Sequence, residues 1–197
     1  MKRAGETFGG ALNAHEERIN AHFQPVMGRL RQGQYIPDIP AHGYSSYAPP
    51  AGSLYAGIFL ATTGILLDSL ALFVAEPATA GKLIRLGIYS CRDDMYPGTL
   101  LLDAGTVTAD EAERRELAIN HTLECGYYYL AVLVEESCGL RYLKLSQSLL
   151  GIYTTFNAVY TGFGCQNGWG LLPEVFPAEA MASNIMRMVI ARVAKTL

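Results

Sequence analysis

The sequence predicts an all-β protein, an antiparallel β-sandwich of jelly-roll type with a short N-terminal helical segment. Apolar and polar residues alternate along several short runs, as in "LIRLGIY", where Ile84, Leu86 and Ile88 share one face. Turn-forming clusters such as "EPATAGK" and "TADEAE" separate these runs. No alternation of strands with helical patterns is visible, and this argues against a parallel sheet with crossover helices.

The runs between turn signals predict strands at about residues 54–61, 65–75, 82–90, 99–107, 114–121, 126–135, 140–146 and 185–194. The first two fall within "SLYAGIFLATTGILLDSLALFVA", a stretch long enough to cross a membrane. Because Thr62, Thr63 and Gly64 interrupt it and Asp68 adds a charge, we expect two strands joined by a turn and no membrane insertion. Residues 147–184 lack a strand pattern, and we expect long loops there.

Residues 11–31 carry a helical pattern. Apolar side chains recur there at spacings of seven and four residues, at Leu12, Ile19, Phe23, Val26 and Leu30. Pro25 cannot continue an unbroken helix, so we expect a break or kink at that position. So narrow a stripe is not stable on a short isolated helix. The pattern therefore predicts a segment that associates with copies of itself or docks on another protein.

Composition divides the chain into three expected parts. Residues 1–33 form the N-terminal helical anchor and oligomerisation segment. Residues 34–53 are rich in Pro and Tyr and predict an extended linker that lies against a surface. Residues 54–197 form the expected sandwich domain, which can bury a large core because half of the chain is hydrophobic.

Charge and cysteine content restrict the function classes. A net charge of −3 and the absence of a long Lys/Arg run argue against nucleic-acid binding. The basic start "MKRAGETFGG" is not followed by the apolar region of a signal peptide. The four cysteines, Cys91, Cys125, Cys138 and Cys165, form no CxxC pair, so we expect thiols made in a reducing cytoplasm.

The acidic pair Asp93–Asp94 is the first candidate for a catalytic or metal site. It precedes Tyr96, Pro97 and Gly98, which is a strong turn context, and Asp side chains commonly bond their own backbone in turns. Paired catalytic carboxylates must face one cleft, and a calcium loop needs further oxygen ligands at alternate positions. The segment therefore predicts a hairpin tip, with no catalytic role for the pair.

The histidines and the absence of known catalytic motifs also argue against a catalytic site. His15 and His22 lie seven residues apart on the expected helix and are interpreted as polar residues beside its apolar stripe, with an ion site as the alternative. No HExxH, GxSxG, GxGxxG or phosphate-loop motif is present. We expect neither a cofactor nor a metal, and we expect that the chain is not an enzyme.

Aromatic residues gather late in the sequence, among glycines and amide side chains. The candidate ligand contacts are Tyr153, Tyr160, Phe163 and Trp169, accompanied by Phe156. Aromatic rings beside amides suit stacking on sugar rings and hydrogen bonding to their hydroxyls. Packing in the core or at a subunit interface is the alternative role of the same residues.

Three strand motifs, "RLGIY" (85–89), "YPGTLLLDAGTV" (96–107) and "GYYYLAVL" (126–133), together resemble a β-sandwich module of tailed-bacteriophage virion proteins. The resemblance covers about residues 54–194, and "FPA" at 176–178 before a last apolar strand fits the end of the module. The chain departs from the module in "LEC" before "GYYY", and residues 1–33 have no counterpart in it.

This resemblance implies a structural protein of the virion, made in the cytoplasm of the bacterial host. Such proteins are commonly trimers that dock on the particle through an N-terminal segment and turn a C-terminal head toward the host. The resemblance thus implies a homotrimeric tail-fibre or spike-like component that attaches to other virion proteins through residues 1–33 and contacts host-surface glycan. The alternative is an assembly or cement protein that stabilises head, neck or tail and binds no ligand.

Overall fold

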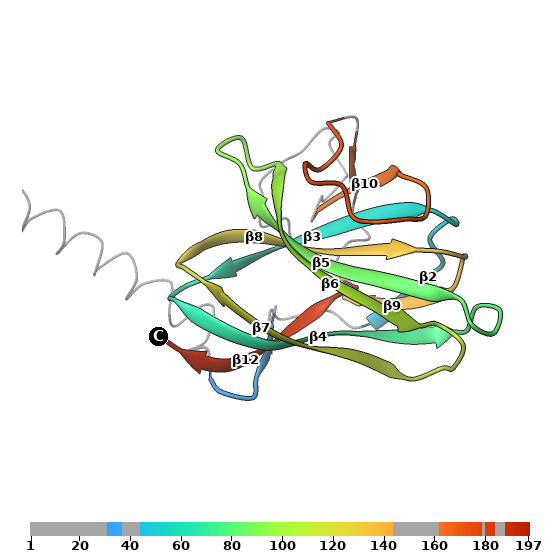
Figure 1. Cartoon of the computed structure of the whole chain (residues 1–197), viewed down its shortest axis with the longest axis horizontal. Coiled ribbons are helices and arrows are strands. Elements are labelled where there is room, and N and C mark those ends of the chain that lie inside the picture. Colours follow the sequence, from blue (N-terminus) through green and yellow to red (C-terminus); the bar gives the residue numbers. More distant parts are fainter. Residues whose placement is uncertain (1–30, 37–43, 144–161, 179, 184–187) are drawn as a thin grey trace, which may run out of the picture. The chain divides into compact units, whose positions relative to one another are not determined.

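The described residues form two antiparallel six-stranded sheets, and for this part of the chain the all-β prediction is confirmed (Figure 1). The computed structural model describes residues 31–36, 44–143, 162–178, 180–183 and 188–197, all of them within one unit, residues 31–197, called the β-unit below. The expected N-terminal helix, with Leu12, Ile19, Phe23, Val26 and Leu30, lies outside the described residues. Within the described ranges, no helix has the length and apolar character needed to cross a membrane.

The first sheet contains the strands that begin and end the β-unit. Its strands run in the order β1 (Tyr35–Ile36), β12 (Ile190–Thr196), β4 (Ile65–Glu76), β9 (Gly139–Leu143) and β2 (Tyr44–Tyr47), with β7 (Arg114–Leu123) also paired to β4. The expected linker thus contributes two short strands, and its tyrosines lie on them.

The second sheet carries most of the long apolar runs. Its order is β11 (Met181–Ser183), β10 (Gly162–Gln166), β3 (Ser53–Ala61), β8 (Gly126–Val134), β5 (Leu83–Cys91) and β6 (Pro97–Thr108). The membrane-length stretch divides as predicted into β3 and β4 around a turn at residues 62–64. The other expected strands correspond to β5 to β9 and β12, with ends that differ by a few residues, whereas β10 and β11 lie where only loops were expected.

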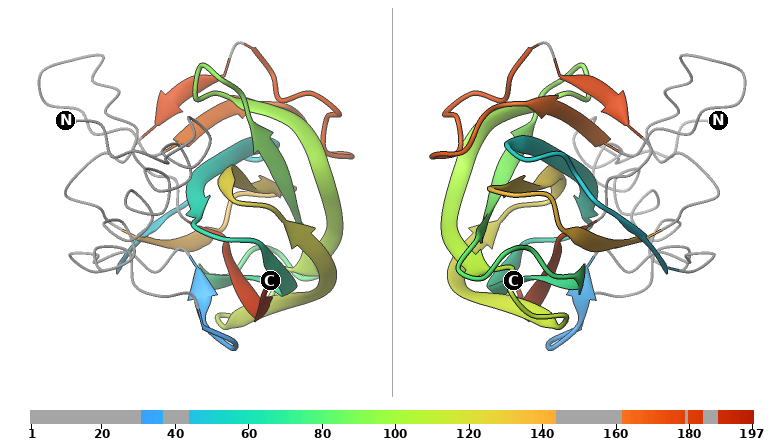
Figure 2. Two further views of the ribbon diagram at one scale, coloured as in Figure 1. Left: turned by 90° about the vertical axis from the view of Figure 1, so that its left-hand side faces the viewer. Right: turned by 90° about the vertical axis from the view of Figure 1, so that its right-hand side faces the viewer.

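The central strands of the second sheet, β3, β8 and β5, are buried on both faces, which explains why they are apolar without strict alternation. One face carries a cluster of buried residues that is completed by Leu172 and Phe176 from the irregular segment after β10. The other face carries Leu86, Ile88 and Val132, which are also buried. Because the two sheets lie as facing layers in Figures 1 and 2, this second face packs against the first sheet.

Residues 172–176, here called the strap, lie along β6, which is the last strand of its sheet. The amide of Leu100 donates to the carbonyl of Glu174, and that of Phe176 donates to Gly98, at 2.8 and 2.9 Å. The buried phenol of Tyr89 donates to the carbonyl oxygen of Pro173 at 2.8 Å. The pairing of β5 with β6 shifts register at three places along its length.

The strand directions bring the turns together at two opposite ends of the β-unit. The terminal end holds turns 62–64, 92–96 and 124–125, together with Arg31 and Leu197. The far end holds turns 51–52, 77–82, 109–113, 135–138 and 167–170. The polypeptide therefore enters the β-unit and finishes at the same end, which is visible for the C-terminus in Figure 1.

Candidate functional site

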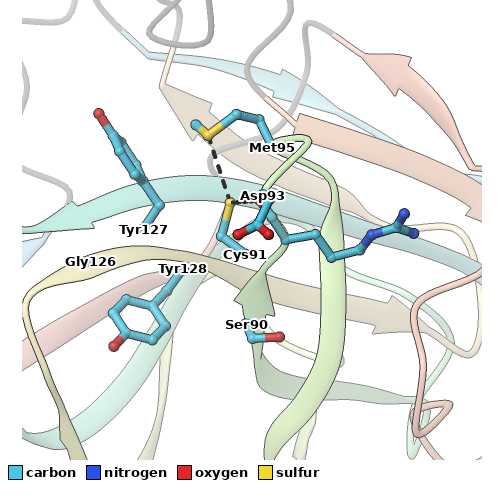
Figure 3. Close-up of a pocket in the computed structure, with 8 residues that line it drawn as sticks. Ser90, Cys91, Asp93, Met95, Gly126, Tyr127 and Tyr128 are labelled. Carbon is cyan, nitrogen blue, oxygen red and sulfur yellow. Dashed lines mark hydrogen bonds between the residues drawn. The ribbon is translucent and has the colours of Figure 1, made fainter.

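A hollow of about 460 Å³ opens at the terminal end, where β5 and β8 meet (Figure 3). The register that pairs Ser90 with Tyr128 sets the end of β5 beside the start of β8. The lining residues come from these two strand ends and from the β5–β6 turn: Ser90, Cys91, Arg92, Asp93, Met95, Gly126, Tyr127 and Tyr128. Its volume lies within the range of roughly 300–1,000 Å³ that is usual for ligand sites.

The β5–β6 turn is the predicted hairpin tip with the Asp93–Asp94 pair. The carboxylate of Asp94 accepts the Tyr96 amide at 3.2 Å and forms an ion pair with Arg92 at 2.7 Å. This is the side-chain-to-backbone bond that was expected of an Asp in a turn. The carboxylate of Asp93 is exposed and forms no hydrogen bond or ion pair with any other described residue.

Backbone contacts fix the position of the tip. Met95 adopts a left-handed backbone conformation with φ of 63°, which is unfavourable for a residue with a β-carbon. Its amide donates to the carbonyl of Arg92 at 2.9 Å, and its own carbonyl accepts the buried phenol of Tyr129. These bonds compensate for the conformation and tie the tip to the core of the second sheet.

Two tyrosines border the hollow from β8 and point to opposite sides of that strand (Figure 3). The side chain of Tyr127 is 40% exposed. Tyr128 packs against Phe59, with ring centroids 5.7 Å apart, and its hydroxyl donates to the Glu124 carbonyl at 3.2 Å. Burial raises the pKa of Tyr128, with a smaller opposing effect from that hydrogen bond. Tyr127 is thus the aromatic ring that the hollow offers to a ligand.

Two sulfur-containing residues, Cys91 and Met95, also line the hollow. The thiol of Cys91 lies 4.0 Å from the thioether of Met95. Burial raises the pKa of Cys91, and the negative charges of Asp94 and Asp93 raise it further. A raised pKa leaves less of the thiol ionised at neutral pH, which makes it a weaker nucleophile than an exposed cysteine. In the described part of the chain, no group of three or more His, Cys, Asp or Glu residues is arranged to hold a metal ion.

The two predicted ligand contacts that the structure describes, Phe163 and Trp169, do not line this hollow. Phe163 is fully buried, with its ring between Tyr96 and Tyr129 at centroid distances of 4.4 and 6.0 Å, so it has no surface to offer a ligand. Trp169 is 38% exposed and lies at the far end, in the turn beside Gly52. Tyr153 and Tyr160 lie outside the described residues.

The hollow was missed in the sequence because its two sides are far apart along the chain. Residues 90–95 and 126–128 become neighbours only through the pairing of β5 with β8. The run "GYYY" directly after the "LEC" turn was the available signal, since three consecutive tyrosines in a strand must place at least one ring on each face of the sheet.

No family model matches the chain, and no curated protein matches it. Among solved structures, the cysteine protease and lectin-like domains of Cwp84, a surface-layer associated protein of Clostridium difficile, match with a TM-score of 0.46 and 13% identity. That match covers 81% of this chain and 37% of that chain. Clostridial cysteine protease Cwp84 after propeptide cleavage matches with a TM-score of 0.47 and 13% identity, covering 81% of this chain and 42% of that chain. The chain thus spans less than half the length of either protein.

Proposed function

We propose that the chain is a non-catalytic structural protein of a tailed-bacteriophage virion, a homotrimeric fibre- or spike-like surface component. In this proposal residues 1–33 attach it to other virion proteins, and the two sheets form a sandwich of jelly-roll type that projects from the particle. The far end contacts host-surface glycan. The strand motifs at 85–89, 96–107 and 126–133 support the proposal by their resemblance to virion modules.

The observation that carries the proposed orientation is the separation of Arg31 from Trp169. Arg31 begins the β-unit at the terminal end, and Trp169 lies in a turn at the far end. A chain held through the residues before Arg31 would present Trp169 away from its attachment. An exposed aromatic ring at the outer end is suited to stacking on a sugar ring.

Hydrogen bonds hold the turn that carries Trp169. The carbonyl of Gly52 accepts the amides of Asn167 and Gly168 at 3.0 and 2.9 Å. The side chain of Gln166 donates to the carbonyl of Ala51 at 2.6 Å and accepts the Ser53 hydroxyl at 3.2 Å. A ring on a fixed turn loses little conformational freedom on binding, which favours recognition.

Adsorption of phage particles to host cells tests this role. The Trp169→Ala and Tyr160→Ala substitutions should abolish adsorption while particles still assemble, and Trp169→Phe should retain it because a ring remains. Particles with normal adsorption after both alanine substitutions would contradict the glycan role. Particles that fall apart would favour the cement alternative.

Light scattering tests the trimer. The full chain should give a mass near three monomers of 21.4 kDa. Deletion of residues 1–30 should yield monomers, because it removes the predicted oligomerisation helix. The β-unit keeps the hydrogen bond from the Gly33 amide to the Val193 carbonyl. A full-length monomer would contradict the proposal, and a trimer that survives the deletion would place its interface in the β-unit.

Exposed apolar side chains along one flank favour the cement alternative as the second candidate. Leu101 of β6 is 39% exposed, and Leu171 and Val175, next to or within the strap, are 73% and 60% exposed. Val175 pairs with Thr99, two residues before Leu101. Apolar side chains gathered at the surface commonly mark protein contacts, and a neighbouring subunit would cover them.

A further inference from the structure

We propose that the hollow at the terminal end binds a lysine or arginine side chain of a neighbouring protein. The identity of that neighbour as a virion protein rests on the proposed function, whereas the preference for a cationic side chain rests on the hollow alone. Three properties of the hollow carry the inference: one carboxylate that no described residue pairs, one exposed aromatic ring and a fixed backbone.

The charge comes from Asp93. Arg92 and Asp94 neutralise each other through their 2.7 Å ion pair, so the tip retains one carboxylate without a partner among the described residues. An unpaired carboxylate at the rim favours a cationic ligand and disfavours an anionic one by direct Coulomb interaction. Acidic saccharides and phosphate groups are therefore poor ligands for this hollow.

The aromatic ring comes from Tyr127, which lines the same hollow and is partly exposed. The face of a tyrosine ring attracts an ammonium or guanidinium group. Two such cation–π contacts occur elsewhere in the β-unit. The Cζ atom of Arg114 lies 5.4 Å from the ring centroid of Tyr35, and that of Arg141 lies 3.9 Å from the ring centroid of Phe73. The positive charge of an arginine or lysine side chain could thus pair with the Asp93 carboxylate and lie against the Tyr127 ring in the same hollow.

The hollow is formed before any ligand arrives. The amide of Arg92 donates to the carbonyl of Tyr96 at 2.8 Å, and the Tyr129 phenol holds the carbonyl of Met95. Binding would therefore cost little ordering of the tip. The hollow also lies at the terminal end, where the chain enters the β-unit, so an attachment through residues 1–33 would turn it toward the particle.

Titration of the full-length protein with N-acetyl-arginine methylamide, followed by NMR of the amide and ring signals, tests the inference. The signals of Ser90, Gly126 and Tyr127 should shift in a saturable manner, and binding should weaken as salt is added. The matched citrulline derivative has nearly the same shape without the charge and should bind at least about five-fold more weakly. Asp93→Asn and Tyr127→Ala should each weaken binding of the arginine derivative to a similar degree.

Two controls make the result specific. Glu76→Gln removes an exposed carboxylate at the opposite end of β4 and should leave binding unchanged. Equal binding of the arginine and citrulline derivatives, or full binding by Asp93→Asn, would overturn the inference. Shifts of the same signals with N-acetylglucosamine and none with the arginine derivative would overturn it in favour of a saccharide site. The titration uses no phage particles, so its failure leaves the adsorption result for Trp169→Ala untouched, and the reverse also holds.

Discussion

The phenol of Tyr35 donates a hydrogen bond to the carboxylate of Glu116, 3.1 and 3.2 Å from its two oxygens. Tyr35 lies on β1 and Glu116 on β7, and β12 and β4 lie between these strands in the sheet. Arg192 of β12 extends the row, with Nε 2.8 Å from Asp68 and Nη1 3.9 Å from Glu116. A polar row across four strands thus ties the short entry strand β1 to its sheet.

Replacement of Tyr35 by phenylalanine should lower the free energy of unfolding by about 1.5 kcal/mol, the low end for a hydrogen bond to a charged group, because the pair is only partly buried. Urea denaturation measures this. Tyr127→Phe is the matched control, since the Tyr127 hydroxyl forms no hydrogen bond with another described residue, and it should change little. Equal losses in the two variants would contradict a specific role of the Tyr35 hydroxyl.

Glu116 should make stability depend on acid. The hydroxyls of Ser69 and Tyr35 and the nearby Arg114 and Arg192 hold the pKa of Glu116 below its ordinary value of 4.5. The folded state therefore binds this proton less readily than the unfolded state, and stability is present above pH 4.5 and lost as pH falls through the lower, folded pKa. Glu116→Gln should be less stable than wild type at pH 7, and the difference should shrink as the pH falls below 4.5. A difference that stays constant with pH would show that Glu116 acts only through packing.

Much of the strand pattern was predictable, because β3, β4, β5 and β8 are long and lie between turn signals. The two- and four-residue strands β1 and β2 are too short to show a period, and they form only because β12 and β9 offer partners. In β10, the sequence "GFGCQ" shows no alternation of apolar and polar residues that would predict a strand. Gly164 is required there because a β-carbon would overlap the ring of Tyr55 on β3, which is a contact between distant parts of the chain.

The candidate site was less predictable than the fold. The Asp93–Asp94 turn was correctly predicted as a hairpin tip, since its turn signals are local. The hollow beside it depends on the register between β5 and β8, which no local pattern specifies. Phe163 and Trp169 are both aromatic residues among glycines in the sequence. Phe163 is buried because it lies on β10, which pairs with β3, whereas Trp169 is partly exposed in the turn that follows.

Gly87→Ala should destabilise the β-unit by roughly 1–3 kcal/mol, because the added methyl group overpacks the contact between β5 and the strap. Its β-carbon would overlap Cδ1 of Leu172 and lie 2.7 Å from the carbonyl oxygen of Leu102. Gly170→Ala is the control, since no heavy atom lies within 4 Å of the added carbon. Thermal unfolding compares the two variants. An unchanged melting temperature for Gly87→Ala would contradict the prediction, because it would mean that the strap can shift without loss of stability.

The thiols should differ in reactivity. Burial raises the pKa of Cys138 to about 11, with a smaller contribution from Glu136, whereas Cys125 is exposed in the β7–β8 turn. Iodoacetamide at pH 8 should therefore label Cys125 first, and peptide mass spectrometry identifies the site. Cys125→Ser should slow the first labelling event, and faster labelling of Cys138 would contradict the buried position.

Reductant should leave the melting temperature unchanged, because no disulfide joins the four cysteines of the chain. Differential scanning calorimetry with and without dithiothreitol checks this. A clear drop on reduction would reveal a stabilising bridge.

The irregular pairing of β6 has a consequence for the behaviour of the protein at high concentration. As the last strand of its sheet, β6 offers backbone groups to which another chain could add, and such additions lead to aggregates. Its three register shifts bend the strand, and the strap occupies the outer backbone groups near Gly98 and Leu100. A straight strand from a second molecule would find no continuous row of donors and acceptors there. This edge of the second sheet is thus a poor template for the addition of a strand from another copy of the chain.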